Sequence, residues 1–168
     1  MFKPKYNLTS EKSVTDKFII ANSKEISVGD AVELNSGFVD LGDASTTAVL
    51  GVVVAIVNED GTPLVTDGTG GAELGSFQGT YTTASDNQTV AKVMAVVNTS
   101  KDAVYQVELD AAAGTTSGSD VIGALFDLAN ETEIDESSVG AGPIQVIGFD
   151  TASPTTVFAK IATSPIRG

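Results

Sequence analysis

Short apolar runs, each closed by a turn signal, constrain the fold of this chain more than any other feature. In EISVGDAVELNSG (25–37), apolar residues keep one parity and polar residues take the other, with a break at Gly29 and Asp30. This alternation is typical of two half-buried strand segments joined by a turn. Comparable runs recur at 18–21, 38–41, 103–110, 121–129, 144–150 and 157–163. We therefore expect an all-β protein of the small barrel or sandwich type.

The longest apolar run, AVLGVVVAIV (48–57), predicts a central strand. It is apolar on both parities and rich in β-branched residues, as expected for a strand that is covered on both faces. The Asp60-Gly61 pair that follows it is a hairpin signal. At ten residues the run is about half the length that spans a bilayer as a helix, so we expect no membrane insertion.

The pattern divides the 168 residues into three parts. The first lacks sustained periodicity and contains Pro4, which predicts an extended arm that ends in a first strand. The second reads as a β-barrel-like domain, and after a small polar linker the third reads as a C-terminal β subdomain. Their boundaries are 1–24, 25–110 and 111–168.

Two segments within these parts need separate interpretation. The Gly- and Thr-rich stretch 67–88 has no buried face apart from Phe77 and Tyr81, and predicts a long exposed excursion. At 121–129 two interpretations stay open. The run fits a strand, but Ser119 and Asp120 would equally suit the cap of a short helix.

Charge is unevenly distributed along the chain, whose net charge is −13. Residues 1–24 hold five lysines and two acidic residues, whereas 25–168 hold four basic and twenty acidic residues. The acidic body argues against nucleic acid as a partner. The basic arm is either a solvated tail or a segment that docks on an acidic neighbour, including another copy of this protein. MFKPKYNLTSEK lacks the apolar run of a signal peptide, so we expect no export.

The chain contains no Cys and no His, which excludes many kinds of chemistry. Disulfides, thiolate nucleophiles, Cys-ligated metals and the usual neutral-pH general base are all missing. The acidic runs NEDG (58–61) and ETEIDE (131–136) lack the ligand spacing of a calcium loop. DGTGG (67–71) lacks the Gly-Lys-Ser/Thr of a phosphate loop. We expect no enzyme, no cofactor and no metal, and nominate no catalytic residue.

Two blocks of the sequence resemble capsid decoration, or cement, proteins of tailed bacteriophages. The first is ISVGDAVELNSGFVDL (26–41), followed by a polar loop and VLGVVVAIV (49–57). It is similar to the GDAV-x-L … G … LGV pattern that precedes a Gly-rich hairpin in those proteins. The second block, 105–161, runs from YQVELD through IQVIGFD to VFAKI and looks like the final β unit of phage head proteins. The arm and the 67–88 excursion lie outside the pattern.

The resemblance implies a structural virion protein on the outside of a phage capsid. Such a protein binds the major capsid protein at many equivalent positions, is often a homotrimer, and reinforces the shell against internal DNA pressure. No cofactor, nucleic acid or membrane is implied. For this role we expect the arm and the excursion to contact neighbouring proteins through their side chains. The alternative for the aromatic residues is that each packs on its own domain. The candidate contact residues are Phe2, Lys3, Lys5, Tyr6, Phe77 and Tyr81.

Two other classes remain open. A carbohydrate-binding or adhesin-like β domain on a virion or cell surface would share the acidic, strand-rich composition. Such domains usually offer exposed aromatic platforms, and this chain has seven Phe, three Tyr and no Trp. A hydrolase that uses only carboxylates is the more distant alternative.

Overall fold

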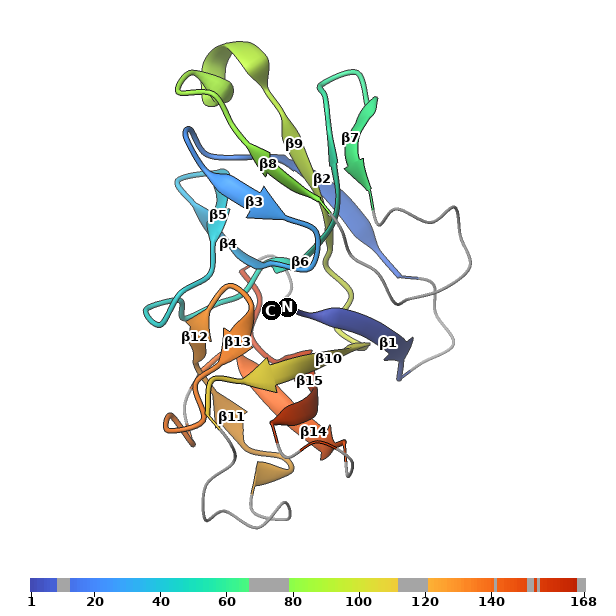
Figure 1. Cartoon of the computed structure of the whole chain (residues 1–168), viewed down its shortest axis with the longest axis vertical. Coiled ribbons are helices and arrows are strands. Elements are labelled where there is room, and N and C mark those ends of the chain that lie inside the picture. Colours follow the sequence, from blue (N-terminus) through green and yellow to red (C-terminus); the bar gives the residue numbers. More distant parts are fainter. Residues whose placement is uncertain are drawn as a thin grey trace.

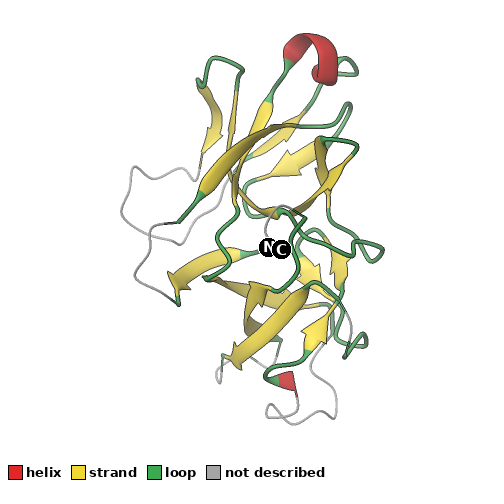
Figure 2. Cartoon of the chain, turned by 180° about the vertical axis from the view of Figure 1, so that it is seen from behind, coloured by secondary structure: helices red, strands yellow, loops and turns green. Residues whose placement is uncertain are grey.

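The computed structural model describes residues 1–8, 13–66, 79–111, 121–140, 142–150, 153 and 155–165. Strands make up about half of this part of the chain and helix only a few residues (Figure 2), which confirms the all-β expectation. Helix is confined to a π-helical turn, η1 (Asn87–Ala91), and to Val121 among the described residues. The strands form two units stacked along the long axis of the molecule, and we call the region where they meet the waist (Figure 1).

The first unit is a curled six-stranded sheet with a two-stranded ribbon beside it. A bridge between Ile20 and Val39 brings the last strand back to the first, so that the sheet nearly closes around its own core. The ribbon pairs β3 (Glu25–Ser27) with β8 (Thr80–Thr82). The sheet order is β2 (Thr15–Ile19), β9 (Met94–Asn98), β6 (Gly51–Val57), β4 (Ala31–Asn35) and β5 (Phe38–Leu41), with β7 (Pro63–Thr66) also paired to β6.

Local sequence accounts for the centre of this unit. Strand β6 pairs with three other strands and is mostly buried, as its apolar character on both parities predicts. The Asp60-Gly61 pair forms the predicted hairpin between β6 and β7, with Gly61 at φ +87°. Ser36 and Gly37 both adopt positive φ and join β4 to β5 in a two-residue turn.

The second unit is a nearly closed barrel. Strands β11 and β12 follow each other along the chain with only Asp127 between them, yet they form the two ends of the sheet, so the same stretch completes the ring. Strand β1 (Lys3–Asn7) pairs with β10 beside this ring. The order is β11 (Leu125–Phe126), β14 (Ile144–Phe149), β15 (Thr156–Ile161), β10 (Ala103–Leu109), β13 (Glu133–Ile134) and β12 (Leu128–Asn130).

The observed division of the chain differs from the expected one. The sequence assigns 103–110 to the first domain, whereas β10 pairs with β1, β13 and β15 in the second unit. The expected extended arm is instead two strands, with β1 in the second sheet and β2 in the first. Pairing with remote strands satisfies backbone groups that an isolated arm would leave to water.

The open choice at 121–129 is decided in favour of strands. Only Val121 is helical; residues 122–123 form a turn, and β11 and β12 follow with Phe126 and Leu128 fully buried. Residues 67–78 of the expected excursion lie outside the described residues, as does most of the linker 111–120. The remainder of the excursion forms β8 and the approach to η1.

Backbone hydrogen bonds join the two units at the waist. Phe2 donates to the carbonyl of Gly29 at 2.9 Å, Ala31 to that of Glu131 at 2.8 Å, and Val49 to that of Thr163 at 3.1 Å. The core of the second unit also includes Ala31, Val49 and Val52 from the first unit. The waist is therefore a packed joint between the units. Nowhere in the described chain is there a helix long and apolar enough to cross a membrane.

Candidate functional site

Strand β1 carries three of the candidate contact residues, and a fourth, Phe2, directly precedes it. Phe2, just before the strand, is 1% exposed and packs in the second core. Its ring meets that of Tyr105 edge to face, with centroids 6.0 Å apart and an interplanar angle of 78°. Phe2 therefore packs on its own chain, which was one of the two expectations for the aromatic residues.

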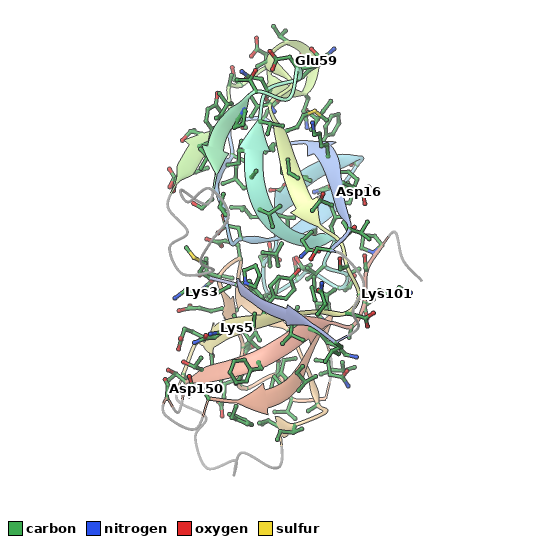
Figure 3. The ribbon with its side chains drawn as sticks, turned by 90° about the vertical axis from the view of Figure 1, so that its right-hand side faces the viewer. Lys3, Lys5, Asp16, Glu59, Lys101 and Asp150 are labelled. Atoms are coloured by element: carbon green, nitrogen blue, oxygen red, sulfur yellow. The ribbon has the colours of Figure 1, made fainter. Side chains whose placement is uncertain are left out.

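The lysines of β1 face outward. Lys3 and Lys5 are exposed, and Figure 3 shows both at the waist. Tyr6 pairs through its backbone with Val104, while its side chain lies outside the described atoms. The strand thus presents two ammonium groups from a backbone held in register against β10.

Strand β1 also bears features that natural sheets use to block edge-to-edge pairing. Pro4 has no N–H to donate, the register shifts between Pro4 and Tyr6, and exposed lysines flank Pro4. Proline, a bulge and lysine each discourage the addition of another strand. Contacts by side chains, rather than an added strand, are what this segment supports.

The two remaining candidates lie away from β1. Tyr81 is half-buried on β8, opposite Ile26, and packs against the core of the first unit. Phe77 lies outside the described residues. The structure therefore brings Phe2, Lys3 and Lys5 together with the backbone of Tyr6, but places Tyr81 in a different sheet.

The turn between β3 and β4 holds the most perturbed carboxyl group at the waist. Asp30 is 4% exposed, and its Oδ2 accepts a 2.7 Å hydrogen bond from the N–H of Ser27. Burial raises the pKa of Asp30 to about 6, with a smaller contribution from Glu131, while the Ser27 hydrogen bond and the amino group of Met1 act in the opposite direction. Burial likewise lowers the pKa of the Met1 amino group.

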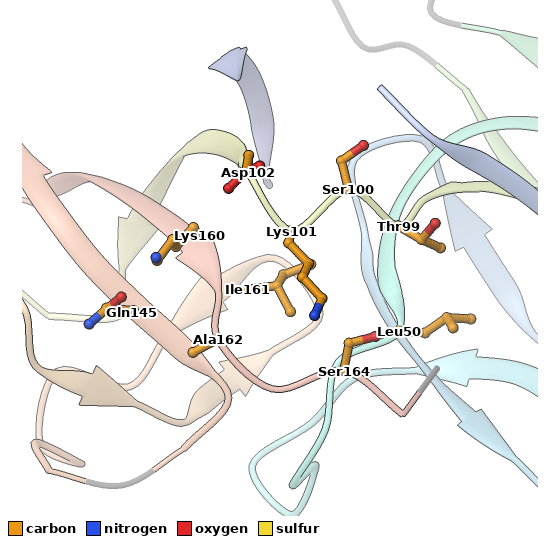
Figure 4. Close-up of a pocket in the computed structure, with 10 residues that line it drawn as sticks. All are labelled: Leu50, Thr99, Ser100, Lys101, Asp102, Gln145, Lys160, Ile161, Ala162 and Ser164. Atoms are coloured by element: carbon orange, nitrogen blue, oxygen red, sulfur yellow. The ribbon is translucent and has the colours of Figure 1, made fainter. Parts of the chain in front are cut away.

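A groove opens at the waist on the segment that connects β9 to β10, and we call it the waist groove (Figure 4). Its volume is about 340 Å³, within the range of ligand-binding clefts. Leu50 and Ile161 supply the apolar part of its lining. The polar lining includes Thr99, Lys101, Asp102, Gln145, Lys160 and Ser164.

Cations outnumber carboxylates around the waist groove, in a chain whose net charge is −13. Lys101 and Lys160 line it with one acidic residue, Asp102. The Oγ of Ser164 is buried and has no hydrogen-bond partner among the described residues. Sequence reasoning missed this site because its residues come from separated segments. The available signal was that two of the four basic residues after position 24 are Lys101 and Lys160.

A smaller hollow of about 130 Å³ lies next to β1 and includes Lys5, Asn7 and Asn98 in its lining. No group of three or more acidic side chains in the described ranges converges in a way that could hold a metal ion.

No protein-family model matches this chain, and neither a curated protein nor a solved structure does.

Proposed function

We propose that this protein is a capsid decoration protein that binds the outer surface of a tailed-phage shell and stabilises it. The observation that carries the proposal is the position of the GDAV stretch at the joint. Residues 29–31 of that motif, which contributes to the resemblance to decoration proteins, bond to Phe2, directly before β1, and to the β12–β13 turn of the second unit. The motif thus has a structural role that suits a rigid clamp.

The proposed mechanism is mechanical. Two units with buried cores and a bonded waist transmit force between contact points without hinging, and they need neither a cofactor nor a nucleophile. Lys3 and Lys5 would contact the major capsid protein or a sister copy, in a homotrimer on the capsid exterior. Each exposed ion pair contributes at most about 1 kcal/mol, but repetition by symmetry over the shell multiplies weak contacts.

Glycan binding on a virion or cell surface is the second candidate, and the waist groove is the observation that favours it. The groove offers hydroxyl, amide and ammonium groups. Its lining contains no aromatic side chain on which a sugar ring would stack. For that reason we rank this candidate below shell binding.

Co-sedimentation with mature shells that lack the protein tests the proposal. We expect saturation at a fixed number of copies per capsid subunit and shells that survive higher temperatures when decorated. Absence of binding to intact shells, together with retention on a glycan array, would favour the second candidate.

Charge reversal is the appropriate way to probe β1. Deletion of the first residues would remove Phe2 from the second core and β1 from its sheet, so a truncated chain would fail for structural reasons. The double variant Lys3→Glu, Lys5→Glu should lower shell affinity. Lys17→Glu, at an exposed site on β2, is the control and makes half of this charge change. Equal shell affinity of the wild type, the double variant and the Lys17→Glu control would exclude β1 as the contact.

A further inference from the structure

The waist groove has the volume of a ligand-binding cleft, and two of its lining residues are lysines. Figure 4 shows Lys160 beside Gln145, and Lys101 on the connecting segment with its side chain directed toward Ser164. The two lysines come from different segments, the β9–β10 connection and β15, so a ligand with more than one negative group can pair with both.

The lining can also recognise more than charge. Gln145 offers an amide whose Nε2 donates to the carbonyl of Gly123 at 3.0 Å. One N–H of this nitrogen and the acceptor Oε1 remain for the backbone of a bound peptide. Leu50 and Ile161 give the ligand an apolar surface.

We infer that the waist groove binds an extended, carboxylate-rich peptide segment of a partner protein. This inference rests on the proposed function for the identity of the partner, which would then be a capsid subunit. Charge complementarity indicates an acidic ligand, because two lysines line the groove. The rest of the chain is strongly acidic and repels such a ligand. A peptide fits better than an acidic glycan because no aromatic side chain lines the groove.

The first measurement uses the isolated full chain and a fluorescently labelled hexaglutamate peptide, followed by anisotropy. We expect saturable one-to-one binding and no binding of hexaglutamine. Lys160→Glu and Lys101→Glu should each weaken binding about tenfold, because each replaces an attraction with a repulsion. The control Lys17→Glu makes the same charge change outside the groove and should shift affinity by less than about twofold.

Several outcomes would overturn the inference. These are no binding at millimolar peptide, an equal loss for Lys17→Glu and Lys160→Glu, or binding of trigalacturonate in place of the peptide. Unchanged melting temperatures will show that the variants are folded. If Lys101→Glu does not fold, Lys160→Glu alone decides the outcome.

Shell binding separates this inference from the proposed function. If Lys160→Glu binds shells as tightly as the wild type, the groove is not the capsid contact and the inference fails, while the decoration role stands. If the wild type binds hexaglutamate but not shells, the decoration role fails and the ligand chemistry of the groove is supported.

Discussion

The backbone N–H of Phe2 donates a 2.9 Å hydrogen bond to the carbonyl oxygen of Gly29. Phe2 places its ring in the core of the second unit, while Gly29 belongs to the turn between β3 and β4 of the first. In the same turn, Gly29 donates to Val53 at 2.8 Å and Val53 donates to Asp30 at 3.0 Å. This short turn therefore links the two units through hydrogen bonds. Substitutions in it should lower the stability of the whole protein.

Gly29→Ala should destabilise the protein by about 2–4 kcal/mol. Gly29 has φ +95°, which costs an L-residue about 1–2 kcal/mol. A Cβ there would also lie 2.5 Å from Cγ of Met1. Gly37→Ala is the control, because Gly37 has φ +88° but nothing within 4 Å of its added Cβ. Urea unfolding should give a larger loss for Gly29→Ala, and equal losses would show that the contact with Met1 is unimportant.

Asp30 should make stability depend on pH. Its pKa is about 6 in the folded protein, against about 3.9 in an unfolded chain. Its contribution is complete below pH 4 and is lost as the pH rises through 6. Asp30→Asn keeps an acceptor for the Ser27 N–H but cannot titrate. Between pH 4 and 7.5 the wild-type unfolding free energy should therefore fall by about 2–3 kcal/mol relative to the variant.

Asp43 provides a control, because its effect on stability should depend on pH in the opposite direction to that of Asp30. Hydrogen bonds from the hydroxyl and N–H of Ser45 lower the pKa of this exposed carboxyl group. Its stabilisation is present at neutral pH and is lost on acidification, so Asp43→Asn should lose stability at pH 7 and converge with the wild type at low pH. Parallel wild-type and Asp30→Asn curves from pH 4 to 7.5 would contradict the assignment for Asp30, which faces Glu131 and the Met1 amino group.

Tyr105→Phe should be neutral or stabilise the protein by up to about 2 kcal/mol. The Tyr105 hydroxyl is buried without a hydrogen-bond partner among the described residues, and burial raises its pKa. Removing an unsatisfied buried hydroxyl relieves its desolvation cost. Tyr105→Leu should cost about 2–4 kcal/mol because it also removes the ring packed on Phe2. A loss above 1 kcal/mol for Tyr105→Phe, measured by calorimetry, would mean that the hydroxyl is bonded.

Asn87→Asp should destabilise the first unit by about 3–5 kcal/mol. Asn87 is fully buried, and its amide nitrogen donates to the carbonyls of Ile20 and Val93 at 2.7 and 3.1 Å. A carboxylate there would face two carbonyl oxygens without a proton to share. Thr89→Ala, on the exposed side of the same turn, should change stability by less than about 0.5 kcal/mol. Similar melting temperatures for the two variants would refute a structural role for the amide.

The sequence alone determined the all-β class and much of the local geometry. Alternation placed Tyr105 and Val107 on the buried side of β10 and Glu108 on the exposed side. The turn chemistry at Asp60-Gly61 predicted the hairpin between β6 and β7. These features depend on neighbouring residues and on the period of a strand, so a local pattern was enough to predict them.

Only the tertiary structure decided which strands pair and where a site forms. Nothing in the local pattern of β1 specifies β10 as its partner, and nothing in 103–110 assigns β10 to the second unit. The alternation in a strand defines its apolar face. Which strand it pairs with depends on the arrangement that buries this face best in the folded protein. The waist groove depends on those pairings, because Lys101 and Lys160 come together only when β10, β15 and the waist are in place.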